Sequence, residues 1–368
     1  MNASTLDLLT SMSRRKAPTE RLTEALPSGE TLEWITLRAG SFQAVLCSHG
    51  ARLLAWQGQD GFNVVVGPQS TAEILADQGA MGVTVGRVCN RIRDAAFDIP
   101  GVGRFALPKN DGSHHLHGGP GGFHTRFWET GELIVEADSA QVSFHLESLP
   151  GDQAYPGHVK AEVIYTLKAD GQLLIQCRAQ VITGISPLNM THHAYWNLGF
   201  HDQTVLEHVL QSPCDRYQET DASSIPTGEL KRVEATLYDF REARSLGPNL
   251  PQAKDPKAPN GYDSFLLRPD FQPTLRSYPL SRLAYVRDPR SQRSLELWTD
   301  QAGFQLYTGN YLDRPFFPQQ AFCLEASAPI DAVNQPDLPS ILVQAGESIE
   351  QLSLYRLHVP RCSASVSS

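Results

Sequence analysis

The chain has 368 residues, of which 41% are hydrophobic and 19% are charged, and its formal net charge is −9. A chain of this length can bury a large core without disulfides or structural metals. Length alone suggests two or three domains, although all-β proteins often exceed the usual domain size as one unit. The acidic balance and the lack of any Lys/Arg run argue against nucleic acid or an anionic membrane as a partner.

The N-terminal segment does not have the form of a signal peptide, because Asp7 interrupts its apolar cluster and Arg14 and Arg15 follow that cluster. No apolar stretch approaches the roughly 20 residues of a membrane helix. The six cysteines are scattered without a C-x-x-C pair, which favours free thiols over a disulfide framework. We therefore expect a cytoplasmic protein, with an N-terminal extension over residues 1–20 and a flexible tail over 361–368.

Two short helices and a longer series of strands are predicted along the chain. The helices are expected over 5–13 and over 71–78, the second capped by Ser70 or Thr71. Alternation of apolar and polar residues predicts strands in the following ranges: 30–38, 42–46, 63–66, 133–137, 142–149, 159–168, 173–181, 294–299 and 305–308. This pattern predicts an all-β fold, with one large antiparallel β-sandwich over 21–360.

The two most regular strands, 159–168 and 173–181, are expected to form a hairpin. A two-residue loop would set Leu167 opposite Leu174 and place the apolar face of one strand against the polar face of the other. A three-residue loop pairs Leu167 with Leu173, so that the apolar faces agree, and puts Gly171 at the left-handed position that such loops require. The sequence therefore predicts the three-residue loop.

Two motifs suggest chemistry that the surrounding residues do not support. The run His114-His115-Leu116-His117 lacks a carboxylate or cysteine at metal-ligand spacing, and no metal site is predicted there. The glycine-rich segment 118–122 lacks the spacing of a phosphate-binding loop, and no helical pattern follows it. No G-x-S-x-G elbow suggests a serine hydrolase.

Several segments combine hydroxyl-binding side chains with aromatic residues. In chain order they are Gly86-Arg87-Val88-Cys89-Asn90-Arg91-Ile92, Leu116-His117-Gly118-Gly119, Thr191-His192-His193-Ala194-Tyr195-Trp196-Asn197-Leu198, Gly261-Tyr262-Asp263, Gln305-Leu306-Tyr307-Thr308-Gly309-Asn310, and Cys323-Leu324-Glu325 with Asp331-Ala332-Val333-Asn334-Gln335-Pro336. From about Gly86 to Tyr355 the chain resembles the aldose 1-epimerase (galactose mutarotase) family. The resemblance implies a large β-sandwich and interconversion of the α- and β-anomers of a free aldose of the glucose or galactose type.

The resemblance also assigns roles to individual residues. His193 resembles the general acid of the family, and Glu325 its general base. The positions that hold the sugar hydroxyls or the ring oxygen are Asn90, Arg91, His117, Asp263 and Gln305. Opening a cyclic hemiacetal requires removal of the anomeric proton and protonation of the ring oxygen, which a carboxylate and an imidazolium on opposite sides of the ring can do together. This chemistry needs no metal and no cofactor.

Other interpretations of the same residues remain open. His193 could be a core histidine, Arg91 an ion-pair partner and Asp263 a turn cap, while Arg87 is expected to be structural. A non-catalytic carbohydrate-binding protein would also use these side chains, and a glycoside hydrolase could pair Asp263 with Glu325.

Three further expectations concern the sugar and the assembly. Aromatic residues expected to cover the apolar face of the sugar are Trp196, Phe304 and Phe123. His192 stands where the family usually has asparagine, which leaves the identity of the sugar open. The partner is expected to be a monosaccharide, and the protein a monomer or homodimer.

Overall fold

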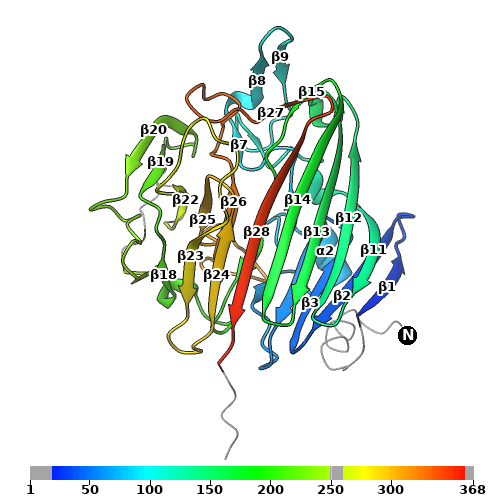
Figure 1. Ribbon diagram of the computed structural model, residues 1–368, viewed down its shortest axis with the longest axis vertical. Helices are drawn as coiled ribbons and strands as arrows, with labels where there is room; N and C mark the ends of the chain where they lie inside the picture. Colours follow the sequence, from blue (N-terminus) through cyan, green and yellow to red (C-terminus); the bar gives the residue numbers. More distant parts are fainter. Residues whose placement is uncertain (1–18, 249, 251–259, 361–368) are drawn as a thin grey trace, which may run out of the picture.

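The computed structural model describes residues 19–248, 250 and 260–360. The predicted helix over 5–13, the predicted tail, and all but the last two residues of the predicted extension lie outside these ranges. The all-β class is confirmed, because the described elements are nearly all antiparallel strands with one α-helix among them (Figure 1). No helix in the described ranges is long and apolar enough to cross a membrane.

One layer of the sandwich is an antiparallel sheet of nine strands, which faces the viewer in Figure 1. In spatial order its strands are β11 (Glu129–Val135), β12 (Ser139–Ser148), β13 (His158–Lys168), β14 (Gln172–Thr183), β28 (Ser348–His358), β24 (Ser294–Thr299), β23 (Ser281–Arg287), β18 (Val209–Gln211) and β21 (Arg244–Ser245). The predicted hairpin is confirmed, since Leu167 pairs with Leu173 and Gly171 has a φ of +79°. A Cβ at Gly171 would lie 2.6 Å from the Phe42 ring, so the packing also requires glycine there.

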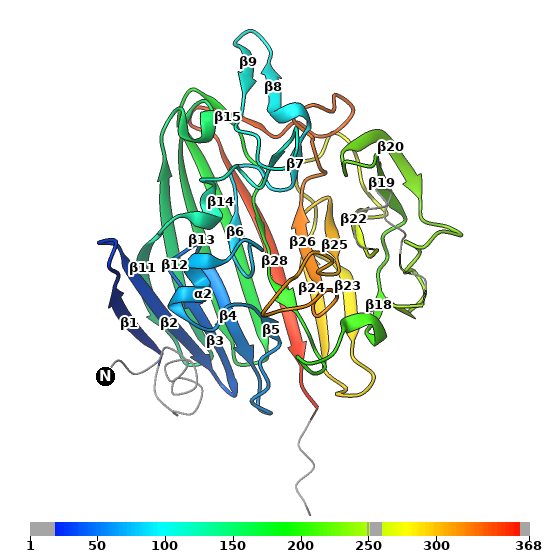
Figure 2. The same cartoon turned by 180° about the vertical axis from the view of Figure 1, so that it is seen from behind.

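The opposite layer consists of two smaller sheets and several short ladders (Figure 2). The four-stranded sheet contains β1 (Glu20–Ala25), β2 (Thr31–Ala39), β3 (Phe42–Cys47) and β4 (Arg52–Gln57). The five-stranded sheet has the order β20 (Pro226–Arg232), β19 (Arg216–Thr220), β22 (Asp263–Leu267), β25 (Gly303–Tyr307) and β26 (Cys323–Ser327). The short ladders pair β5 (Val65–Val66) with β17 (Tyr195–Trp196), β6 (Thr84–Val85) with β16 (Thr191–His192), β7 (Arg91–Ile92) with β10 (His115–Leu116), β8 (Ala96–Ile99) with β9 (Gly103–Ala106), and β15 (Ile185–Pro187) with β27 (Leu342–Gln344).

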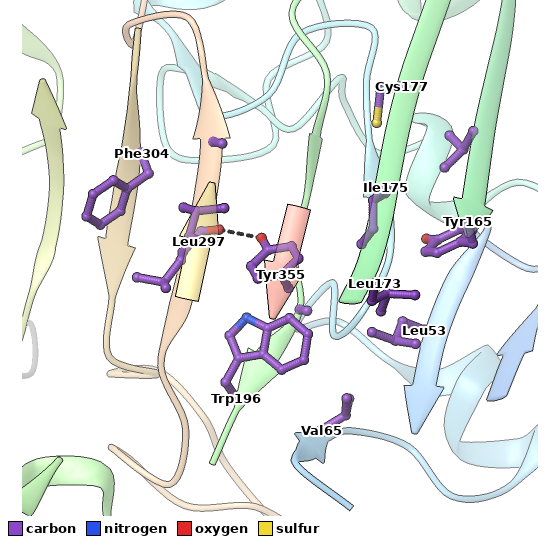
Figure 3. Packing of buried hydrophobic residues seen from close by; sticks show 14 of the residues in the cluster. Leu53, Val65, Tyr165, Leu173, Ile175, Cys177, Trp196, Leu297, Phe304 and Tyr355 are labelled. Atoms are coloured by element: carbon purple, nitrogen blue, oxygen red, sulfur yellow. Dashed lines mark hydrogen bonds between the residues drawn. The ribbon is translucent and has the colours of Figure 1, made fainter. Parts of the chain in front are cut away.

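A single large cluster of buried apolar residues lies between the layers and draws on strands from β2 to β28. Figure 3 shows its centre, where the ring of Trp196 lies 4.9 Å from that of Tyr355. The Tyr355 hydroxyl donates a 2.7 Å hydrogen bond to the Leu324 carbonyl. Tyr355 thus joins the long sheet to β26, the strand that also carries Glu325.

The predicted elements match the structure closely in some places and differ from it in both layers. Strand β24 matches its prediction, and helix α2 (Thr71–Ala76) begins after Ser70, whose side chain accepts a hydrogen bond from the Glu73 amide. Strand β5 is only two residues long, although four were predicted, because Asn63 instead uses its side-chain oxygen to accept from the Trp56 and Val65 amides. Several strands were not predicted, among them β4 in the opposite layer and β23 and β28 in the long sheet.

Candidate active site

The predicted site residues come together around one cavity of about 670 Å³. The cavity is bounded by the end of α2, by residues 311–316, and by strands β7, β22, β25 and β26. All seven predicted residues line it: Asn90, Arg91, His117, His193, Asp263, Gln305 and Glu325. These residues are separated by up to 235 positions in sequence, so only the fold brings them together.

Three of these side chains are aligned by strand register. Strands β22, β25 and β26 are neighbours, and Gln305 on β25 lies directly opposite Glu325 on β26. Asp263 lies opposite Tyr307, two residues from Gln305 and therefore on the same face. The intervening residues Leu306 and Leu324 point into the main core. The period of two thus separates a polar wall from an apolar one.

The side-chain amide of Gln305 connects Gln305 to Asp263 within this polar wall. Its Nε2 donates a 2.5 Å hydrogen bond to Oδ1 of Asp263, which fixes the orientation of the amide. Its Oε1 is buried and has no hydrogen-bond partner among the described residues. Since a buried oxygen without a partner is costly, Gln305 presents an acceptor suited to a hydroxyl group.

His193 lies between β16 and β17 and is held by its backbone. Its amide donates to the Val83 carbonyl at 2.9 Å, and its carbonyl accepts from Gly82 at 2.8 Å. The ring stacks on Tyr195, with centroids 5.0 Å apart and planes 18° apart. Its Nε2 lies 3.5 Å from Oε1 of Glu325, and its Nδ1 lies 3.6 Å from the sulfur of Cys323.

The predicted acid and base are therefore neighbours, and a separation of 3.5 Å leaves no space between them for the sugar ring that was expected there. The ring oxygen and the anomeric oxygen of an aldose are bonded to the same carbon. Two catalytic groups that contact these two oxygens must consequently lie close together. A separation of 3.5 Å between Nε2 and Oε1 meets that requirement.

Asn90 and His117, on the wall of the cavity away from β25 and β26, are joined by two hydrogen bonds. Both have positive φ angles, 58° and 53°. The His117 amide donates to the Asn90 carbonyl at 3.1 Å, and the Asn90 amide donates to Nδ1 of His117 at 3.2 Å. Because Nδ1 accepts, the proton of the neutral ring is assigned to Nε2, which can donate to a substrate oxygen. Gly118 must follow, since a Cβ there would lie 1.9 Å from the Gly86 carbonyl oxygen.

Arg91 is oriented by two carboxylates. Its Nε donates a 2.7 Å hydrogen bond to Oδ2 of Asp111, and its Nη1 lies 3.8 Å from Oδ2 of Asp263. Burial lowers the pKa of Arg91, but Asp263 and Asp111 outweigh this effect and raise it. The guanidinium is therefore charged, and it lies at the floor of a predominantly acidic site.

Burial shifts the ionisation of the catalytic candidates in opposite directions. Burial raises the pKa of Glu325 well above its usual value, and Asp263 adds to this effect while Arg91 opposes it. Burial lowers the pKa of His193 to about 4. Both shifts favour the neutral forms, so a single proton on the pair is held by Glu325 in preference to His193.

The aromatic residues around the cavity differ from those predicted. Trp196, Phe304 and Phe123 all belong to the main apolar cluster, and none of them lines the cavity. That prediction is wrong because each of them points to the core face of its strand or turn. The cavity is lined instead by Tyr195, Tyr307, Tyr311 and Phe316.

Three neighbours of the site were missed, and alternation could have identified them. Tyr195, Tyr307 and Cys323 each lie two positions from a predicted site residue and share its face of the chain. Asp111, which orients Arg91, has no comparable signal, because the contact depends on how the β7–β10 ladder folds back.

The three histidines of the run His114-His115-Leu116-His117 do not converge on one point. Nδ1 of His114 accepts from the Asp94 amide, and Nδ1 of His115 lies 2.6 Å from the Pro108 carbonyl. His117 faces the cavity and bonds to Asn90. Each ring is therefore committed to a different segment. Arg87 is structural as expected, since its guanidinium donates to buried carbonyl and hydroxyl oxygens, among them those of Ser148.

Comparison with known proteins identifies the family of this chain. The sequence profile described as aldose 1-epimerase matches residues 33–356. The chain belongs to the aldose 1-epimerase family. It is 33% identical to the galactose mutarotase of Bos taurus, over 91% of this chain and 96% of the relative. It is 32% identical to the aldose 1-epimerase of Escherichia coli K12, over 90% and 96%.

Solved structures share the fold. A GalM/aldose epimerase homologue from C. elegans superimposes with a TM-score of 0.78 at 28% identity, over 89% of this chain and 99% of the other. The galactose 1-epimerase of Lactobacillus acidophilus superimposes with a TM-score of 0.81 at 22% identity, over 93% and 99%. This member of the aldose 1-epimerase family is thus an isomerase that interconverts the α- and β-anomers of an aldose.

Proposed function

We propose that His193 and Glu325 are the acid–base pair of this reaction, and that the substrate is a free aldose of the glucose or galactose type. The observation that carries the proposal is the 3.5 Å approach of His193 Nε2 to Glu325 Oε1 inside a cavity lined by hydroxyl-binding groups. His193 lies against the ring oxygen and Glu325 against the anomeric hydroxyl. Relatives called galactose mutarotase support galactose as one such sugar.

The reaction needs one proton on the pair. One group donates it to the ring oxygen while the other removes the anomeric proton, and the C1–O5 bond breaks to give the open aldehyde. Rotation about C1–C2 presents the other face of the carbonyl, and closure returns both protons with the roles exchanged. Opening of the cyclic sugar starts with the proton on His193 and with Glu325 ionised, so a proton that rests on Glu325 must first pass to His193 across the 3.5 Å between Oε1 and Nε2.

The remaining predicted residues hold the sugar hydroxyls. Arg91 and Asp263 offer a fixed donor and a fixed acceptor 3.8 Å apart, which suits neighbouring hydroxyls. Gln305 adds the unpartnered Oε1, and His117 adds the Nε2 proton. Tyr195 and Tyr307 provide the apolar surface for the sugar ring.

We further propose that catalysis needs no metal or cofactor, since mutarotation already proceeds unaided in water. General acid–base catalysis supplies typically about 10²–10⁴-fold, which corresponds to roughly 3–5 kcal/mol. Positioning by the hydroxyl contacts adds to this. A glycoside hydrolase that pairs Asp263 with Glu325 would leave His193 without a role.

We also propose a cytoplasmic monomer or homodimer. The five cysteines in the described ranges are all free and buried: Cys47, Cys89, Cys177, Cys214 and Cys323. Denatured, unreduced protein should therefore titrate as six thiols when Cys362 is included. A count of two or fewer free thiols would contradict the cytoplasmic location. Light scattering that finds a trimer or larger assembly would contradict the oligomeric proposal.

Polarimetry tests the function directly. Purified protein, dialysed exhaustively against EDTA, is added to freshly dissolved α-anomers of glucose, galactose and several other aldoses. We expect faster approach to the equilibrium rotation, with glucose or galactose the best substrate and no dependence on added metal. Loss of activity after dialysis, restored by one divalent ion, would contradict the cofactor-free mechanism. A non-catalytic binding protein would show saturable sugar binding with no acceleration.

A further inference from the structure

Cys323 lies behind the catalytic candidates and has no part in the proposed reaction. Its sulfur is 3.6 Å from Nδ1 of His193, and both residues are buried. Ligand atoms of Cys323, His193 and Glu325 all lie within 4.8 Å of one another. Among the described residues, this is the one group of three or more histidine, cysteine or acidic side chains that converges in this way.

We propose that Cys323, His193 and Glu325 form a binding site for a soft divalent cation, best matched by Zn²⁺, and that the bound cation inhibits the enzyme. Thiolate, imidazole and carboxylate are the three ligand types that proteins use for zinc. The presence of a thiolate favours zinc over magnesium or calcium, which prefer oxygen ligands.

The spacing is close to that of a zinc site. Bond lengths of about 2.3 Å to sulfur and about 2.0–2.2 Å to nitrogen and oxygen place tetrahedral ligand atoms roughly 3.5 Å apart. The Cys323 sulfur and His193 Nδ1 already have that separation. His193 can offer only one nitrogen to a cation. When that nitrogen is Nδ1, which lies beside Cys323, the Glu325 carboxylate must swing from Nε2 toward Nδ1.

The site also has an entry path and a rigid frame. His193 and Glu325 line the cavity, so a cation reaches them directly. Cys323 and Glu325 are on the same face of β26, whose register with β25 and whose bond from Tyr355 hold the strand in place. Three protein ligands leave a fourth position for water, toward the cavity.

Occupation removes both catalytic groups. On binding, the Cys323 thiol loses its proton to solvent, as does Glu325 where it holds one, and His193 gives up a nitrogen lone pair. The cation then blocks Glu325 as a base and prevents protonation of the His193 nitrogen that it occupies. Binding itself does not depend on the proposed function, whereas the inhibition does.

Titration with Co²⁺ in the absence of sugar tests the site. We expect one Co²⁺ per chain, with a thiolate-to-cobalt charge-transfer band in the near ultraviolet. Cys323→Ser should lose the band and bind at least about 100-fold more weakly. Cys177→Ser, which removes a thiol that is equally buried but lies in the core, should behave like the wild type. A wild-type protein without the band, or a Cys323→Ser variant that keeps it, would overturn the proposal.

Polarimetry with added Zn²⁺ tests the inhibition. Wild type and Cys177→Ser should be inhibited, reversibly by EDTA, and substrate should compete with Zn²⁺. Cys323→Ser should retain its basal activity and need at least about 100-fold more Zn²⁺ for half inhibition. If thermal unfolding shows that the serine variant is unfolded, Cys323→Ala is used in its place. Equal sensitivity of all variants would overturn inhibition at this site. A Co²⁺ band without any mutarotase activity would instead contradict the proposed function alone.

Discussion

The nine-stranded long sheet and the opposite layer, which contains the cavity, are held together by different kinds of hydrogen bond. Strands β12, β13, β14 and β28 have 10, 11, 12 and 11 residues, and each pairs along most of its length. The strands β6, β7, β10 and β16 around the cavity have two residues each. Backbone ladders hold the first region, whereas bonds from side chains such as Asn63 and His117 hold much of the second.

The two regions also differ in what they bury. The inner faces of β13 and β14 are apolar apart from the hydroxyl of Tyr165, which donates to the Ala51 carbonyl. Outside the long sheet, burial lowers the pKa of four buried histidines and of the half-buried His124: to about 4 in His49, His124, His193 and His208, and to about 3 in His192. The inner faces of β13 and β14 are thus stabilised by terms that do not depend on pH, whereas the region that contains these histidines is not.

The largest expected effect is a loss of stability in mild acid. A histidine whose pKa is lowered by folding stabilises the folded chain above about pH 6.5, and this contribution is lost as the pH falls toward about 4. At pH 5 each of the five groups costs up to about 2 kcal/mol, and the raised pKa values of Glu325 and Asp331 act in the opposite direction. We expect the free energy of unfolding to fall by at least about 5 kcal/mol between pH 7 and pH 5, measured by urea denaturation.

The variant His192→Asn separates this effect from general acid denaturation. Both ring nitrogens of His192 are buried without hydrogen-bond partners among the described residues, so the ring contributes only in its neutral form. The variant should lose up to about 2 kcal/mol of the pH dependence. Stability that stays flat from pH 7 to pH 5 in the wild type would contradict the contrast between the two regions.

The second prediction concerns the catalytic pair. Glu325→Gln and His193→Asn should each lower kcat by at least about 10²-fold, because each removes one partner of the proton transfer. KM should change far less, since Arg91, Asp263 and His117 still contact the hydroxyls. The double variant should be much less impaired than the product of the single effects. If Glu325→Gln keeps a near-normal kcat while Asp263→Asn is inactive, then Asp263 is the general base and Glu325 is not.

The pH profile of kcat/KM follows from the same pair. The active form carries one proton, so activity should fall in acid as His193 takes a second proton, with a pKa of about 4. It should fall in alkali as the pair loses its single proton, which the raised pKa of Glu325 delays. With ordinary pKa values the assignment would be reversed: Glu325 would give the acid limb and His193 the alkaline limb. An acid limb near pH 6.5 would contradict the burial of the imidazole.

Prediction from sequence succeeded where local periodicity determines structure. The hairpin of β13 and β14, including its three-residue loop, followed from keeping Leu167 and Leu173 on one face. The predicted site residues came from the family resemblance, and the structure places them around one cavity. Neither result required knowledge of long-range contacts.

Prediction failed where tertiary contacts decide. Trp196 and Phe304 are aromatic and close in sequence to the site, yet their strands turn them into the core. The approach of His193 to Glu325 depends on how β16 packs beside β26, where the Thr191 hydroxyl donates to the Ala326 carbonyl. No sequence pattern reports that contact, so the relative placement of acid and base could not be derived.

The third prediction addresses the long sheet. Ile175 is fully buried in β14, opposite Tyr165, and belongs to the main apolar cluster. Ile175→Ala should lower the free energy of unfolding by about 2–5 kcal/mol through lost apolar burial and a residual cavity. KM and kcat should stay within about twofold at temperatures where the variant is folded. A kinetic defect without loss of stability would mean that the two regions are coupled.

The smallest expected effect is at Asp111, which lines the cavity and orients Arg91. Asp111→Asn keeps the size of the side chain but removes the charge that orients the guanidinium through the 2.7 Å hydrogen bond. Because the carboxylate is partly exposed, the loss should be about 0.5–1 kcal/mol, which corresponds to a roughly two- to fivefold rise in KM with kcat nearly unchanged. Asp98→Asn, which breaks an exposed pair with Arg104 at 2.9 Å on the β8–β9 hairpin, is the matched control and should leave both constants unchanged. If instead Asp111→Asn lowers kcat and leaves KM alone, Arg91 would be stabilising the transition state rather than binding the sugar in its ground state.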